Sequence, residues 1–281
     1  MLTRDRIRQF LALVLPIAQA VTNIVLGSQV FTEESDQIIR ATGTPDSLFT
    51  PADYAFAVWG PIFLGMIAYG VYQALPAQRE RPLHRRIGWW SIANSVATTL
   101  WAVVVFAAGQ PGTPEARPEF VVVSAVLIVV MLICLTNIFV ALRQMDSDLT
   151  VRDRWLVQVP ISIFFAWICV ATVANWSSAL IAIGLDAGEA AALWTVVMIA
   201  AATLITSGVI LYSRANIGTA AYLSVVVWAL VGLYVATRTE SQAASTASLI
   251  AAGIVLLVAA YRFLNNRPRR GQSPRRMTAT A

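Results

Sequence analysis

The feature that most constrains this chain is a series of eight long apolar segments separated by short polar ones. Each reaches about 20 residues, the length that an α-helix needs to cross the hydrocarbon core of a bilayer. Backbone N–H and C=O groups in lipid must be paired within the protein, which favours helices. We therefore expect an all-α polytopic membrane protein with about eight transmembrane helices. The segments run approximately over residues 9–30, 52–75, 87–108, 120–142, 155–183, 190–212, 219–237 and 243–264.

Composition and charge support this class and predict an orientation. Of the 281 residues, 58% are hydrophobic and 12% are charged, which is typical of a membrane protein. All 20 basic residues are arginine, and only Arg40, Arg117 and Arg238 lie on the side opposite to the termini. The positive-inside rule then places both termini in the cytoplasm, and we expect a bacterial cytoplasmic membrane. Because membrane orientation explains the net charge of +5, no nucleic-acid partner is expected.

Several classes of chemistry are excluded by residue counts. Without lysine the chain forms no retinal or pyridoxal-phosphate Schiff base. With His84 as the single histidine, one chain cannot ligate haem through two histidines. Cys134 and Cys169 both fall within apolar segments, where a small packing role is expected. No Walker loop, dinucleotide fingerprint or zinc spacing is present, so neither a catalytic nor a metal-binding residue is expected.

The first apolar segment and the polar segment after it each have two interpretations. Arginines, an apolar core and Ala18-Gln19-Ala20 are similar to a signal peptide, whose cleavage would leave seven helices. The apolar character continues to Val30, which favours a retained helix. Residues 31–49 form the longest connection between segments, and Thr32 could cap a short helix through Ala41. This connection is either a lid or a solvated acidic connector.

The second segment carries an aromatic stripe. Thr50 is placed to cap its helix, and Pro61 inside the segment predicts a kink. Trp59 and Phe63 are four residues apart and therefore share a helical face, which Met66 and Gly70 continue. Such a stripe either lines a cavity between helices or serves only for packing.

Two further segments place polar and aromatic side chains on one helical face. In the third segment, Asn94 and Trp101 are seven residues apart, about two turns. In the fifth, Trp167, Ala171 and Asn175 recur every four residues, and the small Ala171 leaves room for a neighbouring helix or a flat ligand. A buried asparagine faces protein or water rather than lipid, so hydrogen bonding between helices is the alternative to ligand binding.

Two short motifs resemble the TspO/MBR family, the translocator protein or tryptophan-rich sensory protein. The second helix of that family has proline, seven residues, tryptophan, three residues and an aromatic residue. Its fifth helix has tryptophan, three residues, Ala-Thr, two residues and asparagine. The matching residues here are Pro51, Trp59, Phe63, Trp167, Ala171, Thr172 and Asn175.

The match also has departures. Asn94 corresponds to an asparagine of the family's third helix, whereas Trp101 is displaced from the family's pattern. Tyr54 or Phe56 stands where the family has another tryptophan. Three further helices follow the five, so the chain resembles an enlarged member of the family.

The resemblance implies a five-helix bundle that encloses a pocket for a porphyrin, haem or a sterol-like molecule. The expected organisation is a TspO-like bundle over residues 1–184, three additional helices over 185–264 and a basic disordered tail over 265–281. No resident cofactor is expected, although porphyrin or haem fits as the ligand. The ligand-binding residues expected from the motifs and the helical faces are Trp59, Phe63, Asn94, Trp101, Trp167, Ala171 and Asn175.

The leading hypothesis is a membrane-embedded binder or regulator of a hydrophobic planar ligand, rather than a turnover enzyme. One alternative is an uncoupled transporter of small hydrophobic molecules, although no acid or base lies near the centre of any segment. Another is a structural or partner-binding membrane protein. The expected partners are membrane lipid and a hydrophobic small molecule, with a homodimer as an open alternative.

Overall fold

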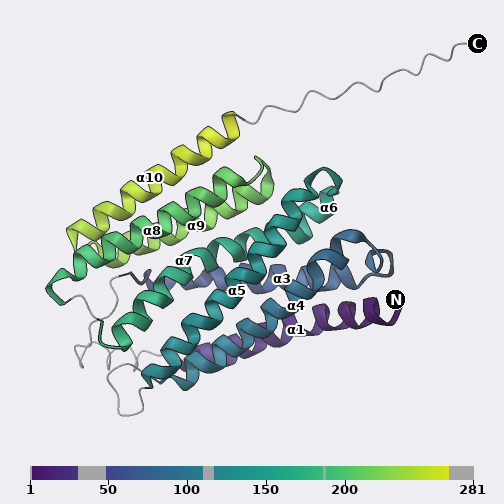
Figure 1. Cartoon of the computed structure of the whole chain (residues 1–281), viewed down its shortest axis with the longest axis horizontal. Coiled ribbons are helices and arrows are strands. Elements are labelled where there is room, and N and C mark those ends of the chain that lie inside the picture. The colour runs from purple at the N-terminus through teal and green to yellow at the C-terminus, as the bar shows by residue number, and fades with distance from the viewer. Residues whose placement is uncertain (1, 31–48, 110–116, 186–187, 266–281) are drawn as a thin grey trace, which may run out of the picture.

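The structure is a computed structural model that describes residues 2–30, 49–109, 117–185 and 188–265 (Figure 1). In these ranges it is all-helical, and eight helical segments are long and apolar enough to cross a membrane. The predicted all-α class and the eight membrane-crossing helices are thereby confirmed. The crossing elements are α1 (Leu2–Val30), η1 with α3 (Asp53–Val58, Trp59–Ala74), α4 (Pro82–Ala107), α5 (Pro118–Gln144), α6 with η4 and α7 (Val151–Asp153, Arg154–Gln158, Val159–Ala182), α8 (Ala191–Tyr212), α9 (Ile217–Thr237) and α10 (Gln242–Leu264).

Helix α7 lies at the centre of the bundle (Figure 1). It packs against α3 and α5 on one side and against α8 and α9 on the other. Its most apolar 18-residue window is 72% buried, against 28–44% for the other crossing segments. A helix that is apolar all round suits this position, because every face of it meets protein. Beyond these neighbours, α4 packs against α1 and α5, and α10 packs against α8 and α9.

The second crossing segment begins differently from the sequence-based expectation. No side chain caps the 3-10 turn η1, so Thr50 does not act as the predicted cap. Instead the backbone N–H of Ala52 donates to the carbonyl of Gly232 in α9 at 3.0 Å. Pro61 is the third residue of α3, where a missing N–H breaks no helical bond. Two residues before Pro61, where the sequence predicts a kink, the segment changes from the 3-10 turn η1 to the α-helix α3 at Trp59.

Helix α9 contacts the start of this segment closely. A Cβ on Gly232 would lie 2.8 Å from Cβ of Ala55, so only glycine permits the observed approach. Trp228 donates its Nε1–H to the Ala55 carbonyl at 2.9 Å and meets the Tyr54 ring edge-on at 5.2 Å. The C-terminal helices thus support the turn that leads into Trp59.

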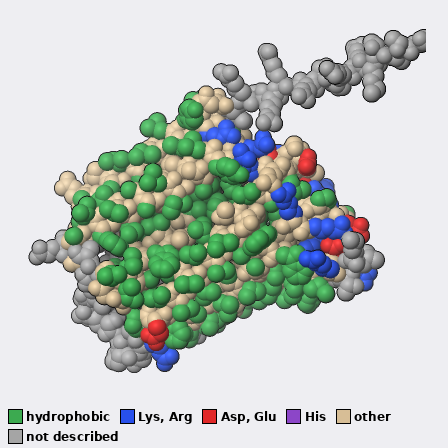
Figure 2. All heavy atoms as spheres, in the orientation of Figure 1, with side chains coloured by type: hydrophobic (Ala, Val, Ile, Leu, Met, Phe, Trp, Pro, Cys, Tyr) green, Lys and Arg blue, Asp and Glu red, His purple; other side chains and the backbone are tan. Residues whose placement is uncertain are grey.

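Charged side chains gather at the end of the bundle that carries the N-terminus, which we call the basic end. Its arginines that bind other segments are Arg79, Arg81, Arg85, Arg154 and Arg214. Figure 2 shows apolar side chains along the length of the visible face, apart from a small charged group at the opposite end. This distribution suits a bilayer around the apolar surface. The predicted helix over residues 32–41 and the basic tail beyond Asn265 lie outside the described residues.

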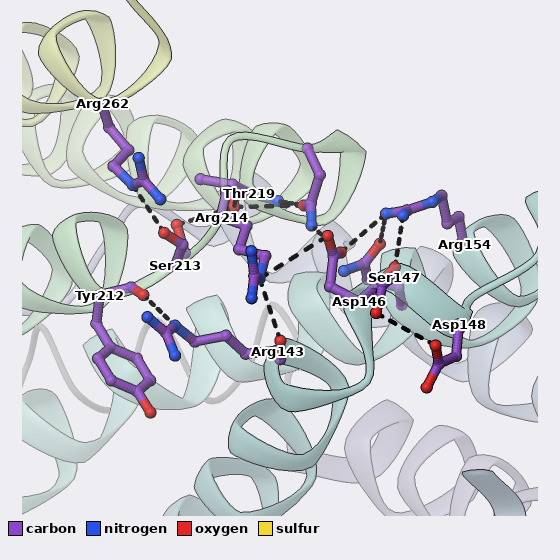
Figure 3. Close-up of polar contacts among 12 residues, drawn as sticks. Arg143, Asp146, Ser147, Asp148, Arg154, Tyr212, Ser213, Arg214, Thr219 and Arg262 are labelled. Atoms are coloured by element: carbon purple, nitrogen blue, oxygen red, sulfur yellow. Dashed lines mark hydrogen bonds and ion pairs between the residues drawn. The ribbon is translucent and has the colours of Figure 1, made fainter. Parts of the chain in front are cut away.

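A polar clamp at the basic end connects the three C-terminal helices to the rest of the bundle (Figure 3). Asp146, in the connection after α5, accepts hydrogen bonds from Arg154 at 3.0 Å and from Asn216 at 2.7 Å. Arg262 of α10 donates to the Ser213 carbonyl at 2.7 Å. The Asn216–Asp146 and Arg262–Ser213 bonds join residues 70 and 49 positions apart, so they align helices that are distant in the chain at this end.

Candidate ligand cavity

A cavity of about 420 Å³ lies between α1, α3 and α4, near the end opposite to the basic end. Its size falls in the range of small-molecule sites, about 300–1,000 Å³. Two residues at its rim, Leu64 and Ile24, are 71% and 63% exposed, so the cavity borders the apolar outer surface. The lining residues are Ala20, Asn23, Ile24, Leu26, Phe56, Trp59, Gly60, Phe63, Leu64, Ile67, Trp101, Ala102 and Val105.

The α-helical repeat explains why these lining residues share one side of each helix. On α3, Trp59, Phe63 and Ile67 follow at intervals of four and therefore project from one face. On α4, Trp101 and Val105 have the same spacing, and Ala20 and Ile24 repeat it on α1. Among the described lining residues Asn23 is the one with an amide side chain, and its Nδ2 donates to the carbonyl of Gln19 at 2.8 Å.

Three aromatic rings form a stack along the cavity wall. Trp59 lies against Phe63 with centroids 5.2 Å apart and an interplanar angle of 23°. It lies against Trp101 at 5.7 Å and 27°. From α7, Phe164 and Trp167 meet the same indole edge-on, at 5.8 Å and 6.3 Å. Contacts on its faces and edges restrict the rotamers of Trp59, so the stack presents a preformed aromatic surface.

The predicted residues of α7 lie behind the cavity rather than in its lining. Trp167 is buried, and Phe56 packs edge-on against it at 5.6 Å. Asn175 accepts a hydrogen bond from Trp101 Nε1 at 3.4 Å and donates to the Ala171 carbonyl at 2.9 Å. The structure thus brings Trp59, Phe63 and Trp101 together in the lining, while Trp167, Ala171 and Asn175 belong to the supporting α7. The roles of all these residues in ligand binding remain predictions.

Asn94 is fully buried and does not line the cavity. Within the described ranges, neither its amide oxygen nor its amide nitrogen has a hydrogen-bond partner. The side-chain amide of Gln19, on the adjacent α1, also has no hydrogen-bond partner among the described residues. The next residue, Ala20, lines the cavity. A buried polar group without a partner costs about 1–3 kcal/mol, so both amides are able to gain from a polar group that reaches them.

The prediction from sequence omitted Asn23 and Phe56, which do line the cavity. Asn23 had a signal, because it is a polar residue within an apolar segment. Phe56 precedes α3 in η1, and only the fold shows that this turn approaches α7.

A second polar group that sequence analysis did not anticipate lies at the basic end. Asp153 is buried at the start of the α6–α7 segment and forms a capping box with Thr150. Arg81 donates to both carboxylate oxygens, at 2.8 Å and 2.7 Å, and the Tyr72 hydroxyl donates at 2.9 Å. The Asp153 carboxylate raises the pKa of Arg81, so this pair stays charged at neutral pH. It fixes the α3–α4 connection to the central helix.

The described lining of the cavity is aromatic and aliphatic apart from Asn23. Its described lining residues include no charged side chain, and the part of the chain that the structure describes contains no group of three His, Cys, Asp or Glu placed to hold a metal ion. An aromatic wall with one asparagine suits an apolar, flat molecule that carries few polar groups.

Comparison with known proteins agrees with this architecture. A family model described as TSPO-like protein matches residues 9–261. The chain belongs to the TSPO-like family. The match confirms the resemblance drawn from the motifs, and it extends from α1 into α10, so this TSPO-like protein is matched over its C-terminal helices as well. No curated protein and no solved structure matches the chain.

Proposed function

We propose that this TSPO-like membrane protein binds a hydrophobic planar ligand, a porphyrin, haem or a sterol-like molecule, and acts as a regulator rather than a turnover enzyme. The observation that carries the proposal is the cavity of about 420 Å³ walled by the stacked rings of Trp59, Phe63 and Trp101. Because these three rings are nearly parallel, a flat ligand can stack on them in the offset arrangement that aromatic rings prefer.

The polar groups near the cavity suit a ligand with a polar edge. Asn23 lines the cavity, and the unpartnered amides of Gln19 and Asn94 lie on the same two helices, α1 and α4. A carboxylate or hydroxyl on the ligand would satisfy them after a rearrangement of side chains. In the proposed complex, the apolar rings of the ligand lie against Trp59 and its polar group points toward α1.

The arrangement in the membrane is part of the proposal. The arginine distribution supports an orientation in which the basic end, and with it both termini, faces the cytoplasm of a bacterial cell. The aromatic cavity then lies in the outer half of the membrane, with Leu64 and Ile24 facing lipid. A hydrophobic ligand would enter laterally from the bilayer.

Titration of the purified protein with protoporphyrin IX tests the proposal. Binding is followed by quenching of tryptophan fluorescence and by the absorption of the porphyrin. We expect saturable binding that is weakened by Trp59→Phe, with a smaller effect of Trp167→Phe because that ring lies outside the lining. Trp155→Phe is the matched control, since Trp155 is 57% exposed and lies outside the cavity lining. A folded wild-type protein that binds neither protoporphyrin nor a sterol would overturn the proposal.

An uncoupled transporter is the second candidate. The rim formed by Leu64 and Ile24 favours it, because a lateral opening would serve release as well as entry. Flux of the bound ligand across proteoliposomes distinguishes the two functions: a regulator binds without flux, whereas a transporter shows flux that Trp59→Phe reduces. If the tryptophan substitutions lower only thermal stability, the structural, partner-binding role is supported instead.

A further inference from the structure

A second cavity lies at the basic end, between the first turns of α1 and α4. Its volume is about 270 Å³, and its lining residues are Arg4, Asp5, Arg8, Arg85 and Trp89. Each helix contributes side chains four residues apart, so one face of each helix forms a wall. It shares no lining residue with the aromatic cavity and plays no part in the function proposed above.

The single carboxylate of this cavity is already engaged. Arg85 donates to Asp5 Oδ2 through Nη2 at 2.6 Å and through Nε at 3.0 Å. Two bonds from one guanidinium make a strong charge-assisted pair, and they leave Asp5 little capacity for another cation.

The charge of Arg8 is incompletely compensated. The side chain is 1% exposed, and it donates to the Arg79 carbonyl at 2.6 Å and to Gln73 Oε1 at 3.3 Å. Its Nε has no hydrogen-bond partner among the described residues, and it forms a 3.6 Å ion pair with Asp5, whose carboxylate is shared with Arg85. Neutral oxygens satisfy N–H groups but do not neutralise a buried charge, which favours binding of an anion.

The packing of α4 holds this guanidinium in place. A Cβ on Gly88 would lie 2.7 Å from Cδ of Arg8, so the stem of the arginine lies directly on the α4 backbone. The position of the charge is therefore set by the helix pair rather than by a flexible side chain.

Arg4 adds an exposed cation to the cavity lining. Its guanidinium lies 5.8 Å from the ring centroid of Trp89, and no described carboxylate is within 4.0 Å of it. Three guanidinium groups and one carboxylate give the cavity lining a formal net charge of +2. Trp89 is 37% exposed, as is common for tryptophan at the level of lipid headgroups.

We infer that this cavity binds a phosphate group, contributed either by the headgroup of an anionic phospholipid or by free inorganic phosphate. Guanidinium groups match phosphate oxygens in charge and geometry, and basic pockets between transmembrane helices suit lipid headgroups. Arg4 and Arg8 supply the charge, while Asp5 holds Arg85 at the wall.

Native mass spectrometry of the full chain, purified in detergent and mixed with lipid, tests the inference. We expect phosphatidylglycerol to be retained in preference to phosphatidylcholine. Arg4→Gln should weaken this retention about fivefold, as expected for the loss of one basic side chain near an anionic headgroup. Arg6→Gln is the matched control, because Arg6 has the same charge and lies in the same turn of α1 but outside the lining.

The source of the phosphate is decided by competition. Displacement of phosphatidylglycerol by inorganic phosphate would assign the site to the free ion, and retention in its presence would assign the site to the lipid headgroup. Equal weakening by Arg4→Gln and Arg6→Gln would indicate diffuse surface attraction and overturn the inference. Equal retention of the two lipids, without binding of inorganic phosphate, would overturn it as well.

Discussion

The indole of Trp59 stacks on that of Trp101, with centroids 5.7 Å apart and an interplanar angle of 27°. This contact joins α3 to α4 across the wall of the cavity, although the two residues are 42 positions apart in the chain. Asn175 of α7 then binds the indole nitrogen of Trp101. The central helix thus orients an aromatic surface that it does not itself line.

Replacement of Trp101 by phenylalanine should weaken ligand binding more than it lowers stability. The smaller ring overlaps less with Trp59 and loses the hydrogen bond to Asn175. An aromatic pair contributes about 0.5–1.5 kcal/mol, so the Kd for protoporphyrin should rise roughly 2- to 10-fold. Trp176→Phe, in α7 outside the lining, is the control. Equal effects of the two substitutions would contradict a specific role for Trp101.

Removal of the charge of Asp146 should loosen the C-terminal helices. Asp146→Asn loses charge-assisted bonds to Arg154 and Asn216, and such bonds contribute about 1.5–3 kcal/mol when a charged group takes part. A lower midpoint of thermal unfolding in detergent is expected. Asp148→Asn is the matched control, because Asp148 is exposed and accepts only from Ser147 among the described residues. An unchanged midpoint for Asp146→Asn would show that the clamp contributes no stability.

A side chain at position 232 should separate α9 from the second crossing segment. In Gly232→Val the new Cβ meets Cβ of Ala55 at 2.8 Å and Cβ of Pro51 at 3.2 Å. Overpacking of this kind costs about 1–3 kcal/mol, and displacement of η1 should also weaken protoporphyrin binding through Phe56. Gly253→Val serves as the control, since a Cβ there meets nothing within 4 Å. Comparable losses from both variants would contradict this account.

Loss of the Arg81 charge should destabilise the protein strongly. Arg81→Gln leaves the buried Asp153 carboxylate without its cation, a change that costs about 3–5 kcal/mol for a fully buried pair. We expect about half of this, because the arginine is 27% exposed. Arg152→Gln, exposed and adjacent in sequence to Asp153, should have little effect.

The pH dependence of this pair follows from the raised pKa of Arg81. A raised pKa contributes stability that is fully present below the ordinary arginine value and is lost only as pH rises through the folded value. The Arg81–Asp153 pair should therefore contribute the same stability throughout the neutral range. A thermal midpoint that depends on pH in wild type but not in Arg81→Gln would contradict this.

The sequence alone determined the number, type and approximate limits of the helices. The fourth apolar segment, expected over residues 120–142, is α5 from Pro118 to Gln144, because the length of an apolar run is a local property that the bilayer thickness converts into a helix. The shared face of Trp59 and Phe63 was equally predictable, since it depends only on the helical repeat. The motifs of the second and fifth helices predicted the family to which the chain belongs.

Only the tertiary structure decided which faces of the helices meet. Trp101 joins Trp59 in the cavity wall, whereas Trp167 lies behind it and Asn94 is buried outside the lining. The rotation of each helix about its axis depends on close packing against its neighbours, and a single apolar segment carries little information about that rotation. The burial of Arg8 and Asp153 has the same origin, because each also has partners on other helices or connections more than 60 residues away in the chain.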